Sequence, residues 1–511
     1  MSDVYSLEYG YINQAFETEP GSNRDTPPLD GKTYLDMQHC RFYASKPRKM
    51  GGFEKYITGN QYPVRAMFQV AIDDFTRVFL FRDTGVSHVD FLPNGSIGNE
   101  VDRTPIDWVV PTPGSPSLTF SVDSYTIFAE DTQETSEVII FAAPPNSENP
   151  SQTTVANVYF APSNSTDRFI FANQTTAGGI VVSVPYIFTF GNNGVMYSNN
   201  GESPLVWTGT GCYTIPVSNS KLLAARRFRG GLLVWSIDTL FNVVPNTTGG
   251  GFTSGEAAPQ ISLLSPSSIV ETHQNGFVWV GNDQFYLYNG VANPIPNTTN
   301  HNYFFDNINL NYKGKVWGLY VGNFQEIWFF YPRGNKTECS DAVIYKLDEN
   351  LWYDTIMART CGLKKKLLNY PLMADSNQNI YSGSQTYAVW AHEVGYNVVN
   401  DNFSYPIESY FQTKLFDAFQ QNPQINLEMI IRKMEIDIIQ SGPLNIEILN
   451  YDYPKSQPSV SSSKVFLESD TQLSLSDQGR YISFKFSSNC LNGFFQMGVN
   501  QINYQLGAVK P

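Results

Sequence analysis

A hairpin-like segment that recurs along the chain constrains the fold more than any other feature. Residues 275–290 read NGFVWVGNDQFYLYNG, in which two aromatic and β-branched runs flank Gly281-Asn282-Asp283. Such runs suit a pleated sheet, and Gly, Asn and Asp tolerate the backbone angles of a tight turn. Upstream, PYIFTFGNNGVMYSNNG repeats this pattern from Pro185, almost residue for residue. The segment is therefore one copy of a repeated unit.

Weaker copies carry the repeat along most of the chain. The apolar runs begin near residues 78, 126, 187, 232, 277, 326 and 372, mostly 45 to 49 residues apart. The interval after 126 is longer, which indicates an insertion there. A period in the forties with hairpin content is typical of β-propeller blades, each of which needs its neighbours to bury both faces. We therefore predict an all-β fold with an irregular β-propeller of about six to seven blades over residues 61–404.

The two ends of the chain differ from the repeats. Near the C-terminus apolar and polar residues alternate strictly, as Ile482, Phe484 and Phe486 do in RYISFKF. Such alternation is typical of an antiparallel sheet with one wet face, so we predict an additional, platform-like β-sandwich over 405–511. We expect residues 1–60 to form an N-terminal arm with entry strands that packs on this sandwich or on a neighbouring subunit. The best short helix candidate is PQINLEMIIRKM, residues 423–434.

The composition argues against several function classes. The formal net charge is −14, so the chain lacks the basic footprint of a nucleic-acid-binding protein. Charged residues make up only 16% and aromatic residues 14%, a balance typical of large buried subunit interfaces. We interpret three local basic clusters, SKPRKMGG, AARRFRGG and LKKK, as solvated or interface patches.

The termini and the cysteines bear on the cellular compartment. The start, MSDVYSLEYG, lacks the basic and apolar regions of a signal peptide, and no apolar run approaches the roughly 20 residues that span a bilayer. The five cysteines are scattered and follow no metal-binding spacing, which favours folding in a reducing compartment.

A search for catalytic motifs finds little. The histidines lie far apart, and the sequence holds no nucleophile elbow, P-loop or well-placed dinucleotide fingerprint. SNNGESPLVW, residues 198–207, is close to the structural S-x-D-x-G-x-x-W box of sialidase propellers, with Asn at the Asp position. We interpret the carboxylates of Asp283 and Asp375, near blade loops, as turn formers. We therefore predict no enzyme activity, no cofactor, and no catalytic, cofactor-binding or metal-binding residues. The five histidines are His39, His88, His273, His301 and His392.

Three segments in order resemble the tail nozzle proteins of short-tailed bacteriophages (podoviruses), also called tail tubular protein B or packaged-DNA stabilization protein. They are RFYASKPRKMGGFEKY, VETHQNGFVWVGNDQFYLYNG and GRYISFKFSSN…NQINY. The resemblance covers most of the chain and lies in its architecture and in local sequence patterns. It implies a structural virion protein, located in the tail and assembled in the host cytoplasm.

The resemblance also implies partners. Such proteins form hexameric rings that dock on the adaptor, or head-to-tail connector, and continue the DNA conduit. They retain the packaged genome until ejection and offer attachment surfaces for fibres or spikes. Double-stranded DNA would pass without specific binding, and an acidic wall suits this because each neutralised phosphate adds affinity. Candidate constrictions, or alternatively surface loops at subunit contacts, are FAAPPNSENPSQTT (141–154) and NTTGGGFTSGE (246–256).

Two other functions stay open at this point. One is a propeller that binds a receptor or a glycan, although lectin propellers usually have more closely identical repeats than this chain. The other is a propeller glycosidase, which would need a cluster of acids and arginines on the propeller axis.

Overall fold

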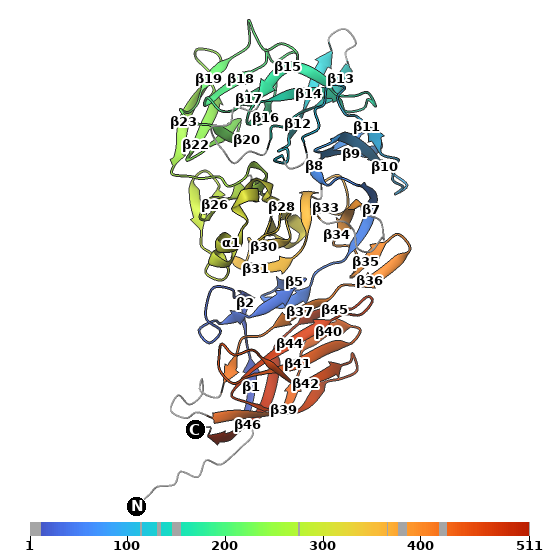
Figure 1. The fold of residues 1–511 in the computed structure, drawn as a ribbon, viewed down its shortest axis with the longest axis vertical. Helices are drawn as coiled ribbons and strands as arrows, with labels where there is room; N and C mark the ends of the chain where they lie inside the picture. Colours follow the sequence, from blue (N-terminus) through green and yellow to red (C-terminus); the bar gives the residue numbers. More distant parts are fainter. Residues whose placement is uncertain are drawn as a thin grey trace, which may run out of the picture.

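Seven sheets of mainly antiparallel strands stand in a ring, one blade after another along the chain, in the upper part of Figure 1. The computed structural model describes residues 12–112, 115–129, 134–145, 155–273, 276–364, 366–376, 386–417 and 427–509. Within these residues the sheets account for seven blades, so the predicted all-β propeller is confirmed. In five of the seven pairs of neighbouring blades the first strands contact one another, which places the first strands around the propeller axis.

The first four blades each hold four strands, paired in chain order. Blade one contains β8 (Val64–Ile72), β9 (Phe75–Arg82), β10 (Gly85–Phe91) and β11 (Val101–Asp102). Blade two contains β12 (Ser121–Ala129), β13 (Glu134–Ala142), β14 (Ala156–Pro162) and β15 (Ile170–Thr176). Blade three contains β16 (Gly179–Ser183), β17 (Tyr186–Phe190), β18 (Val195–Ser198) and β19 (Thr214–Pro216). Blade four contains β20 (Leu222–Phe228), β21 (Gly231–Ser236), β22 (Thr239–Pro245) and β23 (Phe252–Pro259).

The remaining blades complete the ring. Blade five contains β24 (Val270–Glu271), β25 (Phe277–Val280), β26 (Phe285–Tyr288) and β27 (Ala292–Ile295). Blade six contains β28 (Trp317–Val321), β29 (Glu326–Tyr331), β30 (Asp341–Lys346) and β31 (Leu351–Ile356). Blade seven contains β32 (Arg359–Leu363), β33 (Leu372–Asp375), β34 (Tyr387–His392), β7 (Phe53–Asn60), β35 (Asn397–Asn400) and β36 (Phe403–Pro406).

Blade seven closes the ring with a strand from the other end of the chain. Its strand β34 pairs antiparallel with β7, which precedes blade one in sequence. The first strands of blades seven and one, β32 and β8, are also in contact. Strand β7 falls within the predicted N-terminal arm, yet it belongs to the propeller sheet. The domain limits 1–60, 61–404 and 405–511 stay a prediction.

The repeat spacing follows from the second strand of each blade. Six of the seven predicted positions lie in β9, β17, β21, β25, β29 and β33, but residue 126 lies in β12, a first strand. The second strand of blade two is β13, which begins at Glu134. Residues 103–120 connect β11 to β12 and residues 143–155 connect β13 to β14, so the intervals on both sides of blade two are longer than the rest.

The hairpin at 275–290 is the centre of blade five. Trp279 packs edge-on against Trp235 of blade four, with ring centroids 5.4 Å apart. On the other face of the sheet, Phe285 contacts Trp352 of blade six at 4.5 Å. Adjacent side chains of a strand point to opposite faces, so the two aromatic runs supply both neighbouring blades. Gly281 donates from its N–H to the Gln284 carbonyl and closes the turn.

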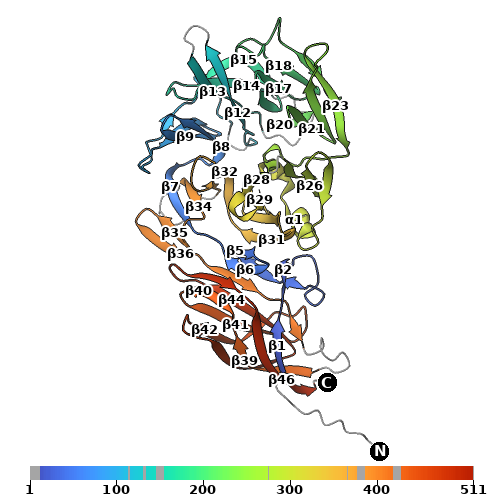
Figure 2. The ribbon, with the colours of Figure 1, turned by 180° about the vertical axis from the view of Figure 1, so that it is seen from behind.

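The lower part of the molecule is built from both ends of the chain (Figures 1 and 2). One sheet has the order β1 (Ile12–Phe16), β46 (Asn500–Val509), β39 (Leu427–Glu435), β43 (Gln472–Gly479). A second has the order β4 (Asp36–Gln38), β37 (Ser409–Gln412), β44 (Tyr481–Ser488), β41 (Leu444–Tyr451), β42 (Ser459–Phe466), and β38 (Phe416–Asp417) also pairs with β44. A third has the order β40 (Ile438–Ser441), β45 (Phe494–Met497), β6 (Lys46–Lys49), β5 (Cys40–Tyr43). N-terminal strands therefore enter all three sheets.

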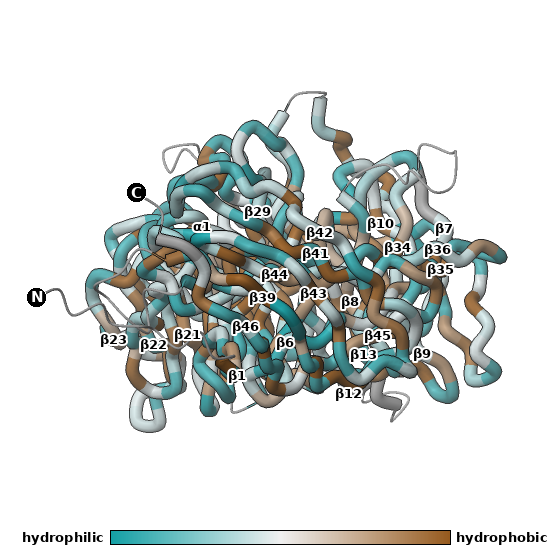
Figure 3. The backbone as a smooth tube through the Cα atoms, turned by 90° about the horizontal axis from the view of Figure 1, so that it is seen from below, coloured by the Kyte–Doolittle hydropathy of each residue, from teal (hydrophilic) through white to brown (hydrophobic). Residues whose placement is uncertain are grey.

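Alternation of side chains along these strands makes the core of this sandwich. Ile482, Phe484 and Phe486 are fully buried, as their period of two predicts. Figure 3, viewed from this end, shows hydrophobic and hydrophilic residues alternating along the strands. The core continues into blade six, because one cluster of buried residues contains both Phe484 of the sandwich and Trp328 of the propeller. The sandwich and the propeller therefore share apolar packing.

Short helical and parallel elements complete the described chain. The short parallel pair is β2 (Glu19–Ser22) with β3 (Thr33–Tyr34). The helices are α1 (His301–Asn307) and the 3-10 turns η1 (Pro266–Ser268), η2 (Leu310–Lys315) and η3 (Gly322–Phe324). The helix candidate at 423–434 is wrong, since its described part forms strand β39. Met429, Ile431 and Met434 are buried there, and a register shift between Ile431 and Lys433 keeps the apolar side chains inward.

A buried arginine joins the two parts of the molecule. Arg41 of β5 forms ion pairs with Glu326 of blade six, at 3.0 Å, and with Glu393, between β34 and β35 of blade seven, at 2.5 Å. Tyr353 and Trp328 donate hydrogen bonds to Glu326 at 2.7 and 2.9 Å. Burial raises the pKa of Glu326, and Arg41 opposes this rise. The carboxylate is therefore solvated by protein groups in place of water.

We expect Arg41→Met to lower the free energy of unfolding by about 3–5 kcal/mol, because it leaves the buried Glu326 without its charged partner. Chemical denaturation followed by tryptophan fluorescence measures this. The matched control is Arg168→Met, which removes an exposed pair with Asp102 and should cost at most about 1 kcal/mol. Equal effects of the two variants would contradict the assigned role of Arg41.

Candidate functional site

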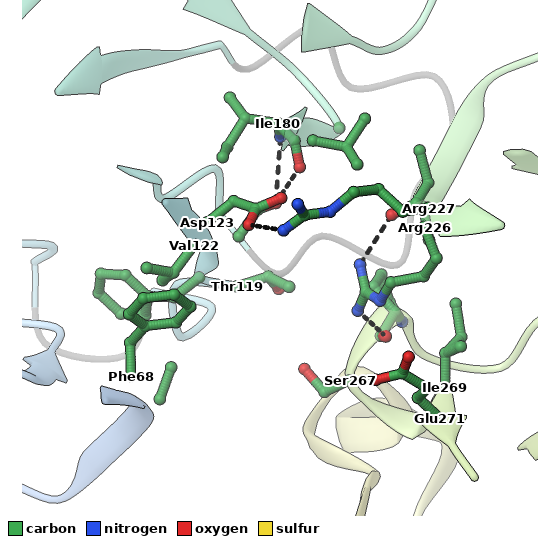
Figure 4. A pocket seen from close by; sticks show the side chains of 18 of the residues that line it. Phe68, Thr119, Val122, Asp123, Ile180, Arg226, Arg227, Ser267, Ile269 and Glu271 are labelled. Atoms are coloured by element: carbon green, nitrogen blue, oxygen red, sulfur yellow. Dashed lines mark hydrogen bonds and ion pairs between the residues drawn. The ribbon is translucent and has the colours of Figure 1, made fainter. Parts of the chain in front are cut away.

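A cavity of about 490 Å³ lies on the propeller axis, between the first strands of the blades (Figure 4). Strands β8, β12, β16 and β20, the η1–β24 segment and Lys366 contribute to its wall. The volume is in the range of sites that hold small molecules.

Arg227 and Asp123 form a charge pair across the cavity wall. Arg227 of β20 lies 2.7 Å from the carboxylate of Asp123 on β12, and the Val182 N–H of β16 donates to the same carboxylate at 2.9 Å. Asp123 thus links blades two, three and four. Burial raises the pKa of Asp123, while Arg227 opposes the rise. The side chain of Arg227 is 51% exposed, so the cavity reaches solvent at this end.

Arg226 points into the cavity beside this pair and is held by backbone groups (Figure 4). Its guanidinium donates to the Ala225 carbonyl at 2.9 Å and to the Pro266 carbonyl at 3.2 Å. Burial lowers the pKa of Arg226, and the carboxylates of Asp123 and Glu271 only partly oppose this. The two carbonyls fix the plane of the guanidinium without neutralising it.

The other charges of the cavity come from blades five and seven. Glu271, at the end of β24, pairs with Lys364 at 3.0 Å. Lys366 is exposed and lines the cavity from the segment between β32 and β33, whereas Lys365 lies outside the described residues. Asp123 pairs with Arg227, and Glu271 pairs with Lys364. The described residues that line the cavity include no further carboxylate that could pair with Arg226 or Lys366.

The opposite wall of the cavity is apolar. Phe68 of β8 lies across the cavity from the two arginines in Figure 4, and further apolar side chains complete this wall. They are Met67, Phe120 and Val122. The cavity therefore has a cationic side and an apolar side, an arrangement suited to a ligand with one charged end.

Two of the three predicted basic patches meet in this cavity. AARRFRGG supplies Arg226 and Arg227, and LKKK supplies Lys366. The interpretation of these two clusters as solvated or interface patches is therefore incomplete. The sequence signal was the place of these clusters within the repeat. Each cluster lies at the end of the first strand of a blade, and first strands lie near the propeller axis.

The third cluster, SKPRKMGG, lies at the junction of sandwich and propeller. Lys49 is 1% exposed and donates to the Ile407 carbonyl at 3.0 Å, so it is not a solvated side chain. Arg48 lies over the rings of Tyr43 and Phe494. Strand pairing brings these cations inside because β6 is an inner strand of its sheet.

The five histidines lie in different parts of the structure, but His39 and His392 lie near one another. His392 accepts a hydrogen bond from Arg359 at 3.0 Å and stacks on Phe53. Burial lowers the pKa of His392 well below its usual value, and His39 and Arg359 lower it further. His39 is also lowered, its pKa falling to about 4, chiefly by burial. His88 is buried, and its pKa is lowered to about 4 by burial and by Arg77.

His273 and His301 hold loops. His273 hydrogen-bonds the Tyr320 hydroxyl at 2.7 Å, and His301 bonds the Asp283 carbonyl at 2.9 Å. Within the described ranges, no three His, Cys, Asp or Glu side chains are grouped as metal ligands would be. The longest helix there is α1, with seven residues, so none has the length of a membrane span.

The two predicted turn carboxylates behave differently. Asp283 lies in the turn between β25 and β26. Asp375 is instead a buried residue of β33, 3.0 Å from Arg359, and burial raises its pKa against the effect of that arginine. Interpreting Asp375 as a turn former is wrong, because the strand continues to this residue.

The sialidase-like box bonds its own turn. The Asn199 side chain accepts from the Ile187 N–H at 2.8 Å and donates to the Ser203 carbonyl at 3.0 Å. Trp207 donates to the Pro204 carbonyl at 2.7 Å. These contacts give the segment 198–207 a structural role in blade three.

The candidate constrictions are only partly described. In 141–154, Phe141 and Ala142 belong to β13, and residues 146–154 lie outside the described residues. In 246–256, residues from Phe252 onward form β23, the last strand of blade four. The second segment is therefore a hairpin turn followed by a strand, and it is not a long loop.

Comparison with solved structures finds a distant structural likeness. No protein-family model matches the chain, and no curated protein does. A solved structure described as that of a "putative 6-phosphogluconolactonase" from Bacteroides fragilis matches 62% of this chain and 95% of its own, at 10% identity and a TM-score of 0.36. The resemblance to tail nozzle proteins is untested by these comparisons and stays a prediction.

The prediction that the chain is not an enzyme is contradicted by this comparison, because the matched structure is described as that of an enzyme. We therefore withdraw that prediction. The likeness is too distant to indicate a reaction or a substrate for this chain.

The buried neutral histidines predict a fold that is sensitive to acid. Histidines of the unfolded chain titrate near 6.5, so between about pH 6.5 and 4 the unfolded state binds more protons than the folded one. The contribution of His88 is fully present above that range and is lost as the pH falls through it, at up to about 1.4 kcal/mol per pH unit.

We expect His88→Asn to flatten the fall in unfolding free energy between neutral pH and pH 5, measured by denaturant titration at several pH values. The control is Phe79→Leu, which disturbs a ring packed against His88 without removing a titrating group. Parallel pH curves for the wild type and His88→Asn would contradict this account.

Proposed function

We propose that this chain is a structural subunit of the tail nozzle of a short-tailed phage, assembled as a hexameric ring. In this role it docks on the adaptor ring, continues the DNA conduit, retains the packaged genome until ejection and offers surfaces to fibres or spikes. The proposal rests on the resemblance described above and on one feature of the sandwich that suits ring assembly.

That feature is the edge strand β42. It pairs with β41 on one side and is the last strand of its sheet among the described residues. Val460 and Val465 of this strand are each 57% exposed, and Ile439 of the neighbouring β40 is 65% exposed. An open edge with exposed β-branched side chains favours pairing with another chain.

Charge supports the same proposal. With a net charge of −14, a ring of these subunits would repel DNA phosphates and let the duplex slide. A contact between different patches of identical subunits closes into a ring when the rotation between them allows it. The continuous core between sandwich and propeller would hold each subunit's two parts at a constant angle within such a ring.

We expect the purified protein to form rings, alone or with the adaptor, in negative-stain images and light scattering. The double variant Val460→Lys/Val465→Lys should weaken assembly about tenfold or more, since each buried valine contributes about 1.5 kcal/mol or more. Val244→Lys, at a similarly exposed valine of blade four, is the matched control and should assemble normally.

Monomers under every condition, with the adaptor present, would contradict the nozzle. Such a result would favour the alternative of a propeller module that binds a receptor or a glycan on its own.

A further inference from the structure

We propose that the axial cavity binds a small organic oxyanion, a phosphate ester or carboxylate whose charged end meets Arg226 and Lys366 and whose apolar part faces Phe68. This site does not depend on the nozzle proposal, because it lies within one propeller and needs no ring.

The first argument is the charge of the cavity relative to the chain. The protein as a whole carries −14, yet three cations line this cavity against two carboxylates. One carboxylate, Asp123, is taken by Arg227 at 2.7 Å, and the other, Glu271, by Lys364 at 3.0 Å. An oxyanion would supply the missing counter-charge.

The second argument is the geometry of Arg226. Two backbone carbonyls hold its guanidinium in a single orientation, so little side-chain entropy is lost when a ligand binds. A guanidinium presents parallel N–H donors that match the two oxygens of a carboxylate or phosphate. Burial lowers the pKa of Arg226, and an anion beside the guanidinium would oppose this effect.

The third argument is access and size. The side chain of Arg227 is half exposed, so the arginine side of the cavity is open to solvent, and Lys366 is also exposed. The volume of about 490 Å³ accommodates a ring as well as an anionic group. The apolar wall formed by Phe68 with Phe120 and Val122 favours a ligand that is more than a bare inorganic ion.

Isothermal titration of the full chain with phenyl phosphate tests the proposal, with benzoate as the carboxylate probe and phenol as the uncharged probe. We expect phenyl phosphate or benzoate to bind and phenol to bind at least about tenfold more weakly, since a charge-assisted pair contributes about 1.5–3 kcal/mol. The relative affinity of the two anions identifies the oxyanion class. Failure of both anions to bind, or equal binding of phenol, would overturn the proposal.

Variants locate the site. Arg226→Gln should weaken binding about tenfold or more, and Lys366→Gln, on an exposed segment, should weaken it without disturbing the inner strands. Arg168→Gln, at an exposed arginine outside the cavity, is the matched control and should bind as the wild type does. Unchanged affinity in both cavity variants would place the anion elsewhere and refute the assignment. Ring assembly measured on the same samples separates this result from that of the nozzle.

Discussion

The ion network around Arg41 is the interaction on which the arrangement of the molecule depends. The chain runs from the sandwich into the propeller and back, and Arg41 lies where the first crossing occurs, between Glu326 and Glu393. A buried charge is tolerated only when its partners are in place, so a displaced propeller would leave three charges in an apolar core. Gly51 supports the same docking, because a Cβ there would lie 2.7 Å from the Cα of Glu393. The ion pairs of Arg41 and the close approach at Gly51 therefore favour one packing of the propeller against the sandwich.

The second consequence of this crossing is closure of the ring. Once the chain has passed Gly51, β7 enters the propeller and pairs with β34 of the last blade. The two ends of the repeat are thus joined by hydrogen bonds within one sheet. Closure also brings into the axial cavity charges that are distant in sequence, such as Asp123 of β12 and Lys366 of the segment between β32 and β33.

Charge is distributed unevenly as a result. The chain is acidic overall, but the axis is cationic and the sandwich edge at β42 is apolar. These two regions suit different interactions, a small anion at the axis and another protein chain at the edge. Because the cavity is small and local, the overall composition does not reveal its excess of cations.

The amino-acid sequence by itself determined the local structure, because turn residues and alternating side chains act over a few residues. The hairpin of Trp279 and Phe285, the recurrence of blades and the buried face of Ile482 and Phe484 were all predictable on that basis. The strand β39 was not, since its apolar residues also fit a helical period until pairing with β46 selects a strand.

Only the tertiary structure decided what depends on distant partners. It decided that the N-terminal strands complete three sandwich sheets and that β7 closes the last blade. It also decided that Asp375 is buried against Arg359, and that Arg226 and Lys366 share a cavity. No local pattern encodes these pairs, because contacts between residues far apart in sequence arise only when the whole ring and sandwich have packed.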